Sequence, residues 1–118
     1  MELDPLPTVK IELLPDGRRG RLLEPIALLS RCHVINVPRG FVTDFASVPR
    51  LFWRIIPPWG EYALASVVHD YLCTQGRFPR KEADLIFLDL MKRLGVPLWK
   101  RQAMYRAVRL YSIATFKK

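Results

Sequence analysis

The sequence predicts an α+β fold, in which a small N-terminal antiparallel sheet of β-hairpins is followed by three α-helices packed on it. Two observations support this prediction. Before about residue 50, apolar residues alternate with polar ones, which is the pattern of half-buried strands. After that point they recur every three to four residues, as they do on the buried side of a helix.

The size and composition of the chain indicate one folded domain over residues 1–118. A chain of 118 residues, half of them apolar, has enough material for one core and too little for two. Within this domain we expect an extended proline-rich arm at 1–8, strands and a motif loop at 9–50, and a helical part at 51–116.

Three segments of the first half have the alternation expected of strands: residues 9–14, 21–29 and 33–37. Pro15, Asp16 and Gly17 form a turn after the first of them, so the second segment is expected to pair back on the first. Pro25 either places this second strand at an edge or splits it, because proline has no N–H to donate.

Three later segments have helical spacing: residues 61–75, 80–94 and 97–116. Gly76 and Gly95 end the first two helices, and Pro79 and Pro97 precede the next two. The third helix is expected to turn one apolar face inward and most of its arginines outward; that face consists of Trp99, Ala103, Ala107, Leu110 and Ala114.

Charge and cysteine content narrow the classes of function. The formal charge of +8 comes from 19 basic and 11 acidic residues. Because the basic residues are scattered along the chain, the charge favours weak, salt-sensitive binding of anionic polymers and only non-specific contact with nucleic acid. Cys32 and Cys73 lack the CxxC spacing of zinc or redox sites and are expected to be free core residues. No signal peptide or membrane-spanning segment is evident, so we expect the protein to act from the cytoplasm.

The segment from Pro38 to Arg50 combines a glycine, prolines, hydroxyls, a carboxylate and arginines within an apolar run. Such a composition predicts a fixed, non-repeating loop, and loops of this kind often carry function. The structural alternative is that Asp44 or Ser47 caps a short helix that continues through residues 51–53.

His69 and Asp84 are polar residues at positions where the helical pattern requires apolar ones. A buried carboxylate needs a partner, and His69 is the nearest candidate across the turn between the two helices. The simplest interpretation is a structural pair that fixes how the helices pack.

A catalytic interpretation adds Asp44 from the loop and Asp70, the residue after His69. In this interpretation Asp44, His69, Asp70 and Asp84 converge. Such oxygen and imidazole ligands suit Mn, Mg or Zn, with Asp44, His69 and Asp84 as the metal ligands. Adjacent helical residues point about 100° apart, which argues against His69 and Asp70 both binding one ion. Without a metal, His69 oriented by Asp84 is a general base, and Ser47 or Thr43 the nucleophile, although no G-x-S-x-G motif is present.

Two motifs, Thr43-Asp44-Phe45-Ala46-Ser47-Val48-Pro49 and His69-Asp70-Tyr71-Leu72, resemble those of a small family of uncharacterised phage and prophage proteins. The resemblance covers about residues 33 to 111, and Cys73 stands where the family usually has tyrosine. It implies a phage or prophage origin but no reaction. It also implies a functional cluster that consists of Thr43, Asp44, Ser47, Arg50, His69, Asp70 and Asp84. In and beside this cluster we expect binding roles for Thr43, Arg50, Asp70 and Tyr71, and catalytic roles for Asp44, Ser47, His69 and Asp84.

Three functions follow as hypotheses. The first is a phage-encoded accessory protein of the virion tail or neck, or of the late genes, which acts in the host bacterial cytoplasm or within the virion, with other virion proteins or a host protein as partners. The second is a metal-dependent hydrolase of an anionic polymer, either peptidoglycan or nucleic acid. The third is a basic module that binds nucleic acid or a host protein through the arginine-rich last helix.

Overall fold

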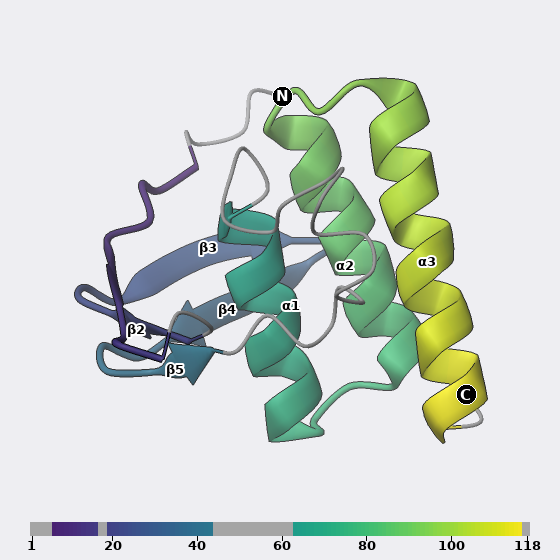
Figure 1. Cartoon of the computed structure of the whole chain (residues 1–118). Coiled ribbons are helices and arrows are strands. Elements are labelled where there is room, and N and C mark those ends of the chain that lie inside the picture. Colours follow the sequence, from purple (N-terminus) through teal and green to yellow (C-terminus); the bar gives the residue numbers. More distant parts are fainter. Residues whose placement is uncertain (1–5, 17–18, 44–62, 117–118) are drawn as a thin grey trace.

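Small antiparallel sheets followed by three helices packed against them form an α+β fold, as the sequence predicts (Figure 1). The computed structural model describes residues 6–16, 19–43 and 63–116. The strands are β1 (Ile11–Leu13), β2 (Gly20–Leu22), β3 (Ile26–Ser30), β4 (His33–Val37) and β5 (Val42–Thr43). The helices are α1 (Ala63–Gln75), α2 (Arg80–Arg93) and α3 (Leu98–Phe116).

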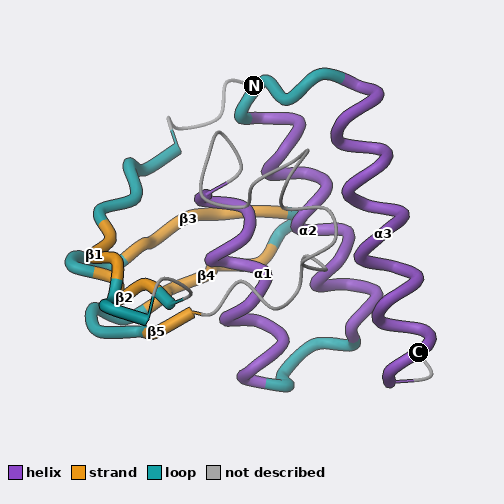
Figure 2. Tube along the Cα trace, in the orientation of Figure 1, coloured by secondary structure: helices purple, strands orange, loops and turns teal. Residues whose placement is uncertain are grey.

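The strands form two separate sheets, which lie on one side of the helices (Figure 2). One sheet has the order β1-β2-β5 and the other is the β3-β4 hairpin, with every pair antiparallel. Pro25 splits the predicted second strand into β2 and β3, which belong to different sheets. The first strand is shorter than predicted, and its last residue, Leu13, is 68% exposed.

The β3-β4 hairpin turns on two residues, Arg31 and Cys32, since Ser30 pairs directly with His33. Both turn residues have positive φ, 49° and 68°, as a tight hairpin with the right-handed twist of strands requires. Cys32 is exposed in this turn, so the expectation that it is a core residue is wrong. Both cysteines are free, and Cys73 is half-buried.

The positive φ of Cys32 in the hairpin turn leads us to expect that a glycine at this position stabilises the fold. Left-handed backbone costs a residue with a Cβ about 1 kcal/mol, which glycine avoids, so Cys32→Gly is expected to raise the free energy of unfolding by about that amount. Cys32→Ser is the matched control, because it removes the thiol and keeps the Cβ. Equal urea midpoints for the two variants would show that the turn stores no backbone strain.

The helices begin and end close to the predicted positions. α1 ends at Gln75, and Gly76 follows with φ +67°; α2 begins after Pro79, and Gly95 lies beyond its end with φ +83°. The start predicted for the first helix, residues 61 and 62, lies outside the described residues. Among the helices of the described part, none is long and apolar enough to cross a membrane.

The core lies where the sheets, α1 and α2 meet. α1 is buried over six consecutive residues, Leu64 to His69, because it packs against β5 and against α2. α3 packs on α2, away from the sheets (Figure 1). The fully buried side chains with the largest volumes come from strands and helices alike: Leu22, Ile26, Val37, Val67, His69, Ile86, Phe87, Leu90, Met91 and Met104.

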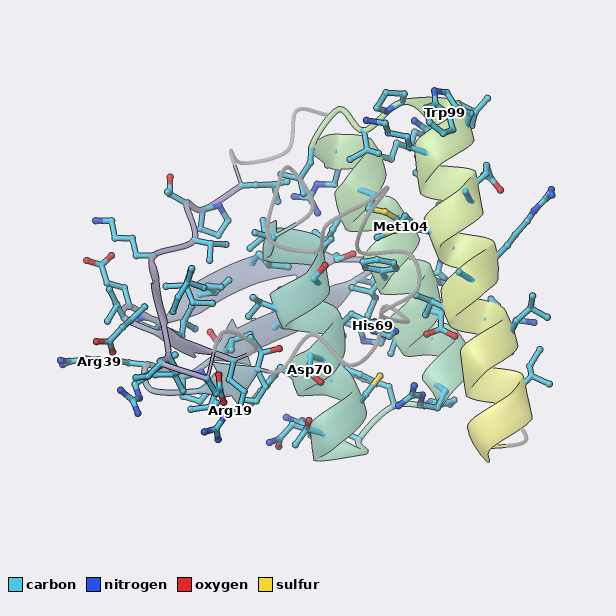
Figure 3. All side chains as sticks on the ribbon, in the orientation of Figure 1. Arg19, Arg39, His69, Asp70, Trp99 and Met104 are labelled. Atoms are coloured by element: carbon cyan, nitrogen blue, oxygen red, sulfur yellow. The ribbon has the colours of Figure 1, made fainter. Side chains whose placement is uncertain are left out.

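The face that α3 turns inward differs from the prediction. Among the α3 side chains that the structure describes, those of Met104 and Val108 are buried, and Met104 lies on the side that faces α2 (Figure 3). Trp99 is 63% exposed, Leu110 is 68% exposed and Ala103 is exposed, so these three residues of the predicted inner face lie on the outside, whereas Ala107 is half-buried. Periodicity failed here because α3 has apolar residues on two opposite sides, and the spacing cannot say which of them meets the core.

Candidate functional site

The three helices each contribute one charged or titratable side chain to a buried cluster. His69 of α1 places Nε2 2.5 Å from Oδ1 of Asp84 on α2, and Arg109 of α3 donates from Nη1 to Oδ2 of the same carboxylate at 2.7 Å. The side chains of His69 and Asp84 are fully buried, and that of Arg109 is 16% exposed. The predicted pairing of His69 with Asp84 is therefore confirmed, and we name the three residues the helix cluster.

Arg109 is the member of the helix cluster that sequence reasoning missed. The predicted inner face of α3 places most of its arginines opposite the core, so no arginine was assigned to a buried cluster. A signal was present, since Arg109 follows the buried Val108 and continues the side of α3 on which Tyr105 is half-buried. Choosing the Met104 and Val108 face as the inner one would have brought Arg109 towards α2.

The helix cluster holds His69 in its charged form. Burial of the ring would by itself lower the pKa of His69, but the hydrogen bond with Asp84 and the nearby Cys73 thiol raise it to about 9. Cys73 Sγ lies 3.7 Å from Nε2 and 3.9 Å from Nδ1, and the Phe87 ring is 5.1 Å away between centroids. At neutral pH two cations therefore share one buried carboxylate.

A second polar contact, next to the helix cluster, joins α1 to the sheet. Thr43 of β5 donates from Oγ1 to Oδ2 of Asp70 on α1 at 2.5 Å, and the Thr43 side chain is buried. Beside it the rings of Phe41 and Tyr71 meet edge to face, 5.2 Å apart. The first and second sequence motifs are thus in direct contact through Thr43 and Asp70.

His69 and Asp70 are neighbours in the chain, yet they serve different partners. His69 reaches Asp84 on α2, whereas Asp70 reaches Thr43 on β5, and the two side chains leave α1 in different directions (Figure 3). Within residues 6–16, 19–43 and 63–116, no three histidine, cysteine or acidic side chains are placed to hold a metal ion. The remaining candidates, Asp44, Ser47 and Arg50, lie outside the described residues.

The contact between the motifs predicts the effect of a substitution. Thr43→Val keeps the shape of the side chain but removes the donor to Asp70, so it is expected to lower the free energy of unfolding by about 1 to 3 kcal/mol. Thr43→Ser retains the hydroxyl and is expected to cost less. If urea unfolding shows that valine is tolerated as well as serine, the hydrogen bond does not tie β5 to α1.

Further polar contacts join the β3-β4 hairpin to α2. Ser30 donates to Asp89 at 2.7 Å, and Arg93 donates to the Leu29 carbonyl at 2.7 Å. Arg31 pairs with Glu82 at 2.8 Å, and the Arg31 guanidinium holds the pKa of Glu82 below its usual value. These contacts extend from the buried Ser30 to the exposed Arg31 and secure the hairpin to α2.

Comparison with known proteins gives the family. A model described as "Protein of unknown function (DUF1353)" matches residues 21–108, which is most of the chain. The chain belongs to the DUF1353 family. The DUF1353 match includes Thr43, His69, Asp70 and Asp84, and ends one residue before Arg109.

One curated relative of this DUF1353 chain is an uncharacterized protein, y4jT, of Sinorhizobium fredii (strain NBRC 101917 / NGR234). The two are 44% identical over 77 residues, which is 64% of this chain and 23% of the relative. The chain thus spans about a quarter of the length of that relative. No solved structure matches the chain.

Proposed function

We propose that the chain is a phage-encoded accessory protein that associates with the virion, and that the helix cluster serves to hold its three helices together. The observation that carries the structural role of the cluster is its closure. His69 and Asp84 have fully buried side chains, and both carboxylate oxygens of Asp84 already accept hydrogen bonds. A substrate would have to displace Arg109 or His69 to reach the carboxylate.

The charge of His69 also favours a structural role. A histidine that ligates a metal must be neutral, and a general base needs a free lone pair. With its pKa raised to about 9, His69 carries its second proton at neutral pH and is not a general base there, and a metal ion would have to displace that proton in order to bind. The helix cluster therefore supports packing of α1, α2 and α3 better than it supports hydrolysis.

The phage origin is supported by the resemblance of the motifs around Thr43 and His69 to those of phage and prophage proteins. A virion component of this origin is made in the cytoplasm of the host bacterium, and its partners are other virion proteins. The net charge of +8 suits contact with acidic protein surfaces.

Two measurements test the proposal. Mass spectrometry of purified virions, released by induction of the host, is expected to detect the chain, and its absence from the particles would overturn the virion role. Metal analysis of the purified chain is expected to find no stoichiometric metal, with the same melting temperature with and without chelator. Near-stoichiometric Zn, Mn or Mg, with a chelator-sensitive melting temperature that Asp84→Asn loses, would instead favour the metal-dependent hydrolase.

A further inference from the structure

We draw no further inference here: the strongest candidate, the half-buried thiol of Cys73 on α1, which lies 3.7 Å from Nε2 of His69, is a single cysteine beside the helix cluster already described, and nothing else in the described part of the chain points to a ligand at it.

Discussion

Asp84→Asn is expected to lower the free energy of unfolding by about 3 to 5 kcal/mol, the largest effect of any single substitution considered for this chain. The carboxylate is the shared counter-ion of His69 and Arg109, and the amide leaves both without it. Arg109 can turn partly towards water, whereas the fully buried His69 cannot. Such a loss is a large share of the total stability of a small domain, about 5 to 15 kcal/mol.

Urea unfolding at pH 7, followed by circular dichroism, measures this loss. Glu12→Gln is the matched control, because it also neutralises a carboxylate paired with an arginine, Arg21 at 3.1 Å, but with both side chains about half exposed. The control is expected to cost about 1 kcal/mol or less. If the Asp84 variant costs no more than the Glu12 variant, the helix cluster does not hold α1, α2 and α3 together.

The second large effect is a loss of stability on the alkaline side of neutrality. The folded chain keeps a proton on His69 up to a pKa of about 9, whereas the unfolded chain releases it near 6.5. The contribution of His69 is therefore complete below pH 6.5 and disappears as the pH rises through about 9. From the difference between the two pKa values we expect a loss of about 3 kcal/mol across this window.

This pH dependence is measured as the difference between the wild type and His69→Gln, which removes the contributions of the other titrating groups. The stability advantage of the wild type is expected to shrink between pH 6.5 and 9. His33→Gln is the control: it removes the other histidine of the chain and leaves the contact between His69 and Asp84 in place, so the decline should remain. Parallel curves for the wild type and His69→Gln would show that the folded chain does not retain this proton.

The pairing at the centre of the helix cluster could be predicted from the sequence, but its third member could not. A carboxylate within an apolar stripe needs a cationic or hydrogen-bonding partner, and His69 was the nearest group able to pair with Asp84. Finding Arg109 required knowing which side of α3 faces α2. The helix has apolar residues on two opposite sides, and only packing distinguishes the side of Met104 and Val108 from the exposed one.

For the strands, too, local sequence pattern predicted some features and missed those that depend on packing or on an unusual turn. Alternation predicted β4 at its observed bounds, and Pro25 indicated the break between β2 and β3. The β3-β4 hairpin was missed because its turn, Arg31 and Cys32, has neither the glycine nor the asparagine that usually marks positive φ. The contact between Thr43 and Asp70 depends on which strand lies beside α1, and local pattern does not contain that information.

The burial of α1 has a consequence for hydrogen exchange. From Leu64 to His69 every side chain is enclosed, and Val67, Val68 and His69 also lie beyond the first turn of α1, where the backbone amides donate within the helix. The amides of these three residues therefore meet solvent only when the surrounding sheet and α2 separate from α1. Their exchange should be the slowest in the chain and should proceed with a free energy close to that of global unfolding. The amide of His69, the first residue of the second motif, would thus report the stability of the whole fold, and a molecule that reached the His69 side chain would do so only in the rare fraction of chains that are open.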